Sequence, residues 1–365
     1  MKKVMLAIST LTGGGAERVA SVWANQLIKK GYEVGFLLYC RSQNEYPVSS
    51  KAKINTLAET YDDYKEMGYF KRVKLMKRAI KAFAPDVVIS FLPRMQIWMM
   101  FATRFMKIKK IETVRISPWH IWNDGVVQRL EKALWKRCFK KADKVIFQTA
   151  EQREFFSSKI EKKGVVIPNP MSEQYRDNPK EAYSDSVKRF VAAGRITSQK
   201  NYPAMIEAFS KVSANHPEVT LSIYGAGDDA YLRKIQGIID KFNLSDKVKL
   251  MGRTTDILSV LKSADAFLMT SDFEGMPNAL AEAMVMGLPC LSTNCRTGPK
   301  DMISDGENGY LVEVSDIDSI ADGIEKLASM DSARAEKMGK AARTTILEMC
   351  SEEMSLKKLI DVIEN

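Results

Sequence analysis

Two glutamates eight positions apart, Glu274 and Glu282, occur in the stretch DFEGMPNALAEAMVMG. Glu282 falls on an apolar helix predicted to start near Asn278, where a glutamate often serves only to complement the helix dipole. A carboxylate on a mostly buried helix nevertheless needs hydrogen-bond donors, and the two hydroxyls of a ribose would supply them. The loop and helix start that would face such a sugar or its phosphate comprise Glu274, Gly275, Met276, Pro277 and Asn278.

Two cations, Arg195 and Lys200, flank a short turn after the predicted strand RFVAA. A planar guanidinium and an ammonium could together neutralise a diphosphate, although such a pair more often lies on a solvated surface. Near the start of the chain, TGGGAER places Gly14 and Gly15 ahead of a predicted helix. This loop could bring backbone N–H groups to a phosphate or form an ordinary tight turn, and it matches neither the dinucleotide-binding nor the P-loop pattern.

Four successive predicted strands in the second half of the chain end in polar or glycine-rich loops. Besides the Arg195 loop and DFEGMPN, these are YGAGDD, with Gly225, and MGRTTD, with Arg253. In doubly wound sheets, ligands bind at the carboxyl ends of the strands. The four loops therefore indicate a binding crevice, and we expect Gly225 and Arg253 to contribute to it.

The elements that must position these loops alternate between short apolar strands and helices in both halves of the chain. Strands that are apolar on both faces, with helices between them, indicate a parallel sheet covered on both sides. The predicted fold class is therefore α/β, with two doubly wound, Rossmann-like domains. A polar segment with two prolines, 170–187, is the predicted linker. We expect domains at 1–172 and 173–350, and a helix within 351–365 that packs back on the first domain.

Composition excludes several classes of protein. The 365 residues are 45% hydrophobic and 27% charged, and no apolar run reaches the roughly 18 residues that span a bilayer. Five scattered cysteines and only two histidines indicate a reducing, cytoplasmic environment and no metal centre. The first 170 residues hold 32 lysines and arginines against 15 aspartates and glutamates, whereas the remainder holds 23 against 30. The basic half predicts contact with an anionic surface.

Taken together, these motifs resemble those of the retaining glycosyltransferases of family four, which have the GT-B fold. The resemblance rests on GGAERV near the start, on GR followed by KN after the linker, and on EGMPNALAE, an E-x7-E motif. It covers nearly the whole chain and is most specific over residues 190–314. It implies two Rossmann-like domains facing a central cleft, the first binding an acceptor and the second a nucleotide-sugar.

The resemblance also implies a role for each motif. Gly14 and Gly15 would lie beside the donor phosphate and the transferred sugar, and Arg195 and Lys200 would stabilise charge on the departing diphosphate. Glu274 would hold hydroxyls of the transferred sugar. Glu282 would hold the ribose hydroxyls. No metal and no other cofactor would be needed.

One position near the reacting sugar has two candidates in ETVRISPWHIWN. Many family members have a histidine there and some have arginine, so we favour Arg115 and keep His120 as the alternative. In GPKDM the family usually has glutamate where this chain has Asp301, which we expect to help bind the donor. The other histidine, His216, is expected to be structural.

The basic first half would then dock on a membrane. In KRVKLMKRAIKAF (71–83), apolar residues recur at helical spacing among lysines and arginines, and RFMKIKK (104–110) adds further cations. This pattern is compatible with a bland surface helix, but we favour docking on the anionic inner face of the plasma membrane. The expected reaction moves a sugar, most simply from a UDP-sugar, to a polysaccharide or lipid-linked oligosaccharide. The alternatives are a nucleotide-sugar epimerase and a non-catalytic protein that binds sugar nucleotides or polyanions; nucleic acid is not an expected partner.

Overall fold

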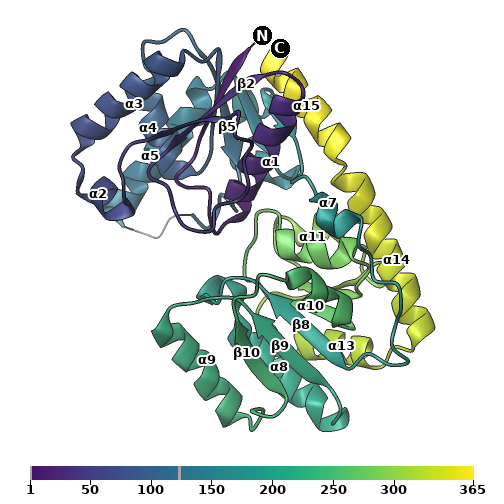
Figure 1. Ribbon diagram of the computed structural model, residues 1–365. Coiled ribbons are helices and arrows are strands. Elements are labelled where there is room, and N and C mark those ends of the chain that lie inside the picture. The colour runs from purple at the N-terminus through teal and green to yellow at the C-terminus, as the bar shows by residue number, and fades with distance from the viewer. Residues whose placement is uncertain (1, 122–124) are drawn as a thin grey trace. The chain divides into compact units, whose positions relative to one another are not determined.

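The computed structural model describes residues 2–121 and 125–365 (Figure 1). The chain divides into two compact units. The first runs to Pro170 and also includes Glu352–Asn365, and the second is Met171–Ser351. Each unit contains one parallel sheet, of seven and six strands respectively. The predicted fold class is confirmed.

The first sheet has the strand order β3-β2-β1-β4-β5-β6-β7. Its strands are β1 (Lys3–Ala7), β2 (Glu33–Leu38), β3 (Lys53–Thr56), β4 (Val87–Ser90), β5 (Lys109–Val114), β6 (Lys144–Phe147) and β7 (Gly164–Val166). All but β3 follow predicted strands; β3 lies in a segment that we expected to be a polar loop. This short edge strand, KINT, has no fully buried residue, so its sequence carries little of the apolar pattern that marks a strand.

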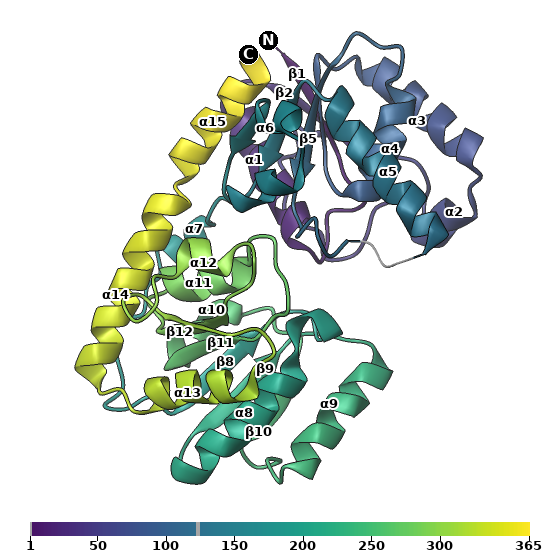
Figure 2. The ribbon, with the colours of Figure 1, turned by 180° about the vertical axis from the view of Figure 1, so that it is seen from behind.

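Helices cover both faces of the first sheet (Figures 1 and 2). They are α1 (Gly15–Lys29), α2 (Tyr61–Glu66), α3 (Tyr69–Phe83), α4 (Pro93–Ala102), α5 (Val126–Lys141), the 3-10 helix η1 (Glu151–Phe155), α6 (Ser158–Glu161) and α15 (Glu352–Glu364). On one face, Leu359 and Ile363 of α15 join Trp23 of α1 in a single buried core. On the other face, α3 and α4 share a second core.

The basic helix α3 uses its apolar side inside the unit. Met76, Ile80 and Phe83 are all buried in the core beneath it. The lysines and arginines that are exposed on its outer side are Lys71, Lys74, Arg78 and Lys81. The apolar stripe of this helix is therefore not available to a membrane, whereas its charges are. Among the described residues, no helix is both long and apolar enough to cross a bilayer.

The second sheet has the strand order β10-β9-β8-β11-β12-β13. Its strands are β8 (Arg189–Ala193), β9 (Thr220–Tyr224), β10 (Val248–Gly252), β11 (Ala266–Met269), β12 (Cys290–Thr293) and β13 (Tyr310–Val312). The helices are α7 (Glu173–Arg176), η2 (Ser198–Lys200), α8 (Tyr202–Asn215), α9 (Asp229–Lys241), α10 (Ile257–Ser263), α11 (Asn278–Val285), α12 (Pro299–Met302), α13 (Ile317–Ala328) and α14 (Ser332–Met349). Helices α8 and α13 pack in one core, and α11 and α14 in another.

The segment 170–187, predicted as a linker, is folded against the second unit. Met171 and Tyr175 are buried in the core that contains α11. The ammonium group of Lys180 donates hydrogen bonds to the carbonyls of Lys262 and Ala264, at 3.1 and 2.7 Å. This polar segment is therefore not a free linker, since it makes hydrogen bonds to the second unit.

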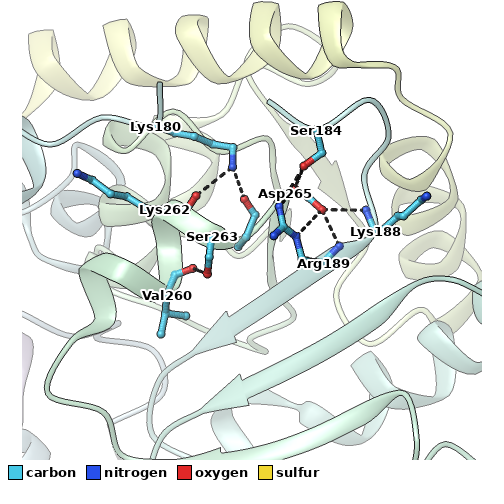
Figure 3. A network of polar contacts seen from close by, with 9 residues as sticks. Lys180, Ser184, Lys188, Arg189, Val260, Lys262, Ser263 and Asp265 are labelled. Carbon is cyan, nitrogen blue, oxygen red and sulfur yellow. Dashed lines mark hydrogen bonds and ion pairs between the residues drawn. The ribbon is translucent and has the colours of Figure 1, made fainter. Parts of the chain in front are cut away.

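A buried carboxylate fixes the end of this segment where β8 and β11 begin (Figure 3). Asp265 accepts hydrogen bonds from the Ser184 hydroxyl at 2.7 Å and from the backbone N–H groups of Lys188 and Arg189 at 3.2 and 2.9 Å. The Arg189 guanidinium donates to it at 2.8 Å. Burial alone would raise the pKa of Asp265, but these donors, Arg189 foremost, lower it to about 2.

Candidate functional site

The loops after β8, β9 and β10 lie side by side, as expected for the carboxyl ends of parallel strands. Backbone hydrogen bonds continue between them beyond the strands. Gly194 N donates to Tyr224 O at 2.9 Å, and Gly225 N donates to Gly252 O at 2.8 Å. The polar loops of the second unit are therefore held together as a group by their own backbones.

This close approach explains the glycine at position 225. A Cβ placed on Gly225 would lie 1.8 Å from the carbonyl oxygen of Gly194. No side chain fits there without a shift of backbone. The contact that requires a glycine is thus between two loops of the protein itself, so the predicted role of Gly225 in binding a ligand stays a prediction.

Lys200 and Glu274, 74 positions apart in the chain, are brought into direct contact. The Lys200 ammonium donates to Glu274 Oε1 at 2.6 Å, and the two side chains are only 14% and 9% exposed. The lysine lies at the end of η2, after β8, and the glutamate lies in the loop after β11. Two residues predicted separately, for a phosphate and for a sugar, thus form one ion pair.

The loop that carries Glu274 is fixed from two sides. On one side, Gln199 Nε2 donates to Phe273 O at 2.8 Å. On the other, the Thr297 hydroxyl donates to the carbonyl of Glu274. Neither Gln199 nor Thr297 belongs to a motif predicted from the sequence; the signal for Thr297 is its position directly before the GPKDM loop.

The GPKDM loop packs on the same segment through its glycine. Gly298 has φ of +93°, and a Cβ on it would lie 2.7 Å from Gly275 O and 3.3 Å from the Cα of Met276. Asp301 accepts a hydrogen bond from Gly298 N at 3.1 Å and so fixes the turn that starts α12. The structure gives Asp301 this local function, whereas its expected contact with a donor stays a prediction.

Helix α11 starts where the sequence indicated, with Pro277 as its N-cap and Asn278 as its first residue. Glu282 is on this helix and is buried, with 8% of its surface exposed. Its neighbours along the helix, from Leu280 to Val285, are all buried. The predicted carboxylate on a buried helix is therefore present in the structure.

Arg195 and Arg253 are exposed at the ends of β8 and β10. In residues 2–121 and 125–365, neither side chain makes a hydrogen bond or an ion pair. These two solvated arginines lie at the same edge of the sheet as the paired Lys200. That edge can attract and hold an anionic group.

In the first unit, the glycine loop lies at the end of β1 and leads into α1. Gly13 has φ of +83°, a backbone conformation that favours glycine, Gly14 is the N-cap and Gly15 is the first helical residue. The Glu17 carboxylate turns back over this loop, and a Cβ on Gly14 would meet its Oε2 at 2.1 Å. A ligand could therefore approach the backbone of this loop closely only if position 14 remains a glycine and the Glu17 carboxylate moves aside.

Arg115 and His120 have very different surroundings. His120 is exposed, with Nδ1 3.0 Å from the Ser117 hydroxyl. Arg115 is 7% exposed; its guanidinium donates to Asn169 Oδ1 at 3.0 Å and lies over the Trp23 ring at 4.4 Å. Burial lowers the pKa of Arg115 to about 9. Two of its nitrogens, Nε and one Nη, are buried without a hydrogen-bond partner in the described part of the chain.

The described residues contain no cluster of three or more histidine, cysteine or acidic side chains that could hold a metal ion. The charged side chains predicted for the donor site at these strand ends are those of Arg195, Lys200, Arg253 and Glu274. The chemistry that such a set can perform is the binding of an anionic leaving group next to a carboxylate that binds hydroxyls.

Two protein-family descriptions match this chain, one on each half. "Glycosyltransferase Family 4" matches residues 13–174, and "Glycosyl transferases group 1" matches residues 173–345. Among individual proteins, the chain is similar to an uncharacterized glycosyltransferase of Haemophilus influenzae, with 23% identity over 99% of this chain and 98% of that protein. It is also 23% identical to the amylovoran biosynthesis glycosyltransferase AmsD of Erwinia amylovora, over the full length of both. An uncharacterized glycosyltransferase of Methanocaldococcus jannaschii is 29% identical over 64% of this chain, and that match covers 61% of the relative.

Solved structures share the fold. TarM superimposes with a TM-score of 0.83 at 17% identity, over 100% of this chain and 99% of that one. Anabaena HepE, solved in complex with UDP, gives a TM-score of 0.79 at 15% identity, over the full length of both chains. Since these identities are low, the structures bear on architecture alone. The two family descriptions together match both halves of the sequence, and the solved structures match the fold of both sheets. This chain therefore belongs to glycosyltransferase family four and has the GT-B fold.

Proposed function

We propose that this enzyme transfers a hexose or N-acetylhexosamine from a UDP-sugar, with retention of configuration, to a cell-surface polysaccharide or a lipid-linked oligosaccharide. The observation that carries the proposal is the ion pair of Lys200 and Glu274 at 2.6 Å, at the strand ends that also carry Arg195 and Arg253. Relatives support the choice of substrates. One from Escherichia coli is named a UDP-Gal:alpha-D-GlcNAc-diphosphoundecaprenol alpha-1,3-galactosyltransferase, and one from Campylobacter jejuni is named for an acceptor on PP-undecaprenol.

The Lys200–Glu274 pair would link the two halves of the donor. An ammonium group has three N–H donors, so Lys200 can keep Glu274 and still donate to a phosphate oxygen. Glu274 keeps a second carboxylate oxygen for hydroxyls of the transferred sugar. As the bond between the sugar carbon and the phosphate oxygen breaks, its electron pair stays on the diphosphate. Lys200 and Arg195 stabilise this charge, and the acceptor hydroxyl bonds to the sugar carbon and gives its proton to the phosphate oxygen that has left that carbon.

The remaining predicted residues complete the proposed donor site. Glu282 would accept hydrogen bonds from the ribose hydroxyls, and the backbone from Gly275 to Asn278 would face the sugar. Gly14 and Gly15 would lie beside the donor phosphate. No metal is assigned a role, because arginine, lysine and backbone N–H groups would neutralise the diphosphate.

Arg115 is proposed to lie next to the reacting sugar, with His120 as the alternative. The two buried guanidinium nitrogens without a partner support this, since an unsatisfied buried donor is costly and a hydroxyl or phosphate oxygen would satisfy it. His120, in contrast, is already within hydrogen-bond distance of Ser117.

The proposed reaction is tested by release of nucleoside diphosphate from UDP-, GDP- and ADP-sugars, with and without a membrane lipid extract. We expect release from one UDP-sugar that rises at least tenfold when the extract is added. Conversion of a donor to its epimer without any acceptor would favour the epimerase. Tight donor binding without turnover, with and without extract, would argue for the non-catalytic alternative.

We also propose that the protein is cytoplasmic and docks on the anionic inner face of the plasma membrane through the exposed basic side of α3. Each basic residue near such a surface contributes about 1 kcal/mol. Replacing Lys71, Lys74, Arg78 and Lys81 by glutamine should therefore reduce the partition onto phosphatidylglycerol vesicles at least tenfold at low salt. Sedimentation with vesicles measures this.

A matched control removes four lysines that are exposed on the second unit, Lys234, Lys241, Lys249 and Lys337. Its net charge changes by the same amount, so it should bind vesicles nearly as well as the wild type does. Equal loss in both variants would mean that net charge, and not α3, determines the binding.

A further inference from the structure

The first unit contains a cavity of about 450 Å³ that lies outside all of the motifs predicted from the sequence. Its lining residues come mainly from α2, α3, α4 and α5. These helices lie on the face of the sheet opposite to α1 and α15 (Figures 1 and 2). The cavity wall includes Tyr39, directly after β2, and Arg94, at the start of α4, and so it lies towards the carboxyl ends of the strands. Ligands of doubly wound sheets bind at that end.

The wall of the cavity is mainly aromatic. Tyr39 and Tyr64 stack with ring centroids 3.9 Å apart. Tyr69 packs against Trp98 at 5.1 Å and against Phe101 at 5.7 Å. Pockets lined in this way bind apolar groups, with a few polar side chains that fix the orientation.

The polar side chains in the wall carry a net positive charge. Three cations line the wall, Lys65, Arg72 and Arg94. Two carboxylates lie next to them: Glu131, which also lines the wall, is 3.8 Å from Arg94, and Asp62, beside the cavity, pairs with Lys65 at 2.7 Å. The Arg72 guanidinium is held over the Tyr64 ring at 4.4 Å, and one of its Nη atoms donates to Tyr64 O at 2.8 Å. Its Nε is buried without a partner in the described residues. The wall thus favours an anionic group over a neutral or cationic one.

Large apolar side chains are exposed around this cavity. Phe70 of α3 is 85% exposed and packs edge-on against Tyr69, which lines the cavity. On α5, Val127 and Leu130 are 66% and 62% exposed. Val127 lies two turns and Leu130 one turn before Leu134 of the cavity wall, on the same side of the helix. Exposed apolar side chains next to a pocket are typical of a surface that binds a membrane, a ligand or another protein.

We propose that this cavity binds the lipid carrier of the acceptor, with the first part of its hydrocarbon chain against the aromatic wall and its phosphate at Lys65 and Arg94. This inference rests on the proposed function, because it names the part of a lipid-linked acceptor that the first unit recognises. An aqueous saccharide would not require the exposed Phe70, Val127 and Leu130. A phosphate alone would not require the aromatic wall.

The test is photo-crosslinking of the full-length protein with a benzophenone-bearing analogue of farnesyl diphosphate, without any nucleotide-sugar. Labelled peptides are mapped by mass spectrometry. We expect adducts in 61–72, 93–101 or 126–134, and competition by farnesyl diphosphate at concentrations at least tenfold lower than by inorganic diphosphate or farnesol. Because no turnover is needed, the result does not depend on whether the donor assignment is correct.

Two variants locate the site. Leu134→Trp fills the cavity, and Arg94→Glu reverses one charge in its wall; each should reduce labelling at least fivefold with an unchanged melting temperature. Arg104→Glu is the matched control, because Arg104 is exposed outside the cavity wall and should keep labelling within twofold. Adducts confined to the region of Arg195 and Lys200 would overturn the proposal. So would equal competition by inorganic diphosphate or farnesol, or equal loss of labelling in Arg94→Glu and Arg104→Glu.

Discussion

Replacing Lys200 by alanine should reduce kcat/KM for sugar transfer by about 10²- to 10³-fold, the usual effect of removing one charge or donor that stabilises a developing anion. The loss has two sources. The diphosphate loses a cation as the sugar departs, and Glu274, only 9% exposed, loses its partner at 2.6 Å. Steady-state kinetics with the donor identified by the release assay measures the effect.

Two further variants separate these sources. Lys200→Met combined with Glu274→Gln removes both charges, so it should recover thermal stability lost in Lys200→Ala and remain inactive. Lys211→Ala, which breaks an exposed pair with Asp318 on α8 and α13, should leave kcat/KM within twofold of the wild type. Activity in the double variant near that of the wild type would show that Lys200 serves only to neutralise Glu274.

Replacing Asp265 by asparagine should destabilise the second unit by about 2–3 kcal/mol at neutral pH. The folded protein holds the pKa of Asp265 at about 2, whereas an unfolded aspartate has a value of about 3.9. A depressed pKa contributes stability above the unfolded value and loses it as the pH falls through the folded value. The difference between wild type and variant should therefore be full at pH 7 and shrink progressively between about pH 4 and pH 2.

The positions of the tryptophans allow this effect to be assigned to one unit. All five lie before residue 136, so tryptophan fluorescence reports on the first unit, whereas far-ultraviolet circular dichroism reports on both. We expect the variant to shift the denaturation transition seen by circular dichroism and not the one seen by fluorescence. Asp246→Asn, at an exposed carboxylate, is the control and should change stability by less than about 0.5 kcal/mol. A shift of equal size in the control would refute the assignment to the Asp265 network.

Local signals in the sequence predicted the elements that carry the site. Helix α11 starts at Asn278 and ends before Gly287, because Pro-Asn and Gly-Leu-Pro mark its two ends. The family motifs likewise identified Glu274 and Lys200 one by one. Their pairing depends on strand order, which brings the ends of β8 and β11 together across 74 positions, and no local pattern encodes that distance.

Contacts between side chains of different helices and strands could not be predicted from local sequence signals. The cavity wall takes residues such as Tyr39, Tyr69 and Trp98 from different elements, each of which is an ordinary aromatic residue in its own segment. Asp265 is a single aspartate before a strand, and its donors come from 184–189. The burial of Arg115 over Trp23 likewise depends on how α1 packs on the sheet, which the glycine loop before it does not reveal.

The return of α15 to the first unit has a consequence for synthesis on the ribosome. Domains generally fold in order as they emerge, and the second unit is one continuous segment, Met171–Ser351. The first unit emerges earlier, but its core lacks Leu359, Val362 and Ile363 until the last helix has left the ribosome. The unit whose translation starts first is therefore completed only after the second unit has emerged, and until then the part of its core that α15 covers is exposed and available to chaperones.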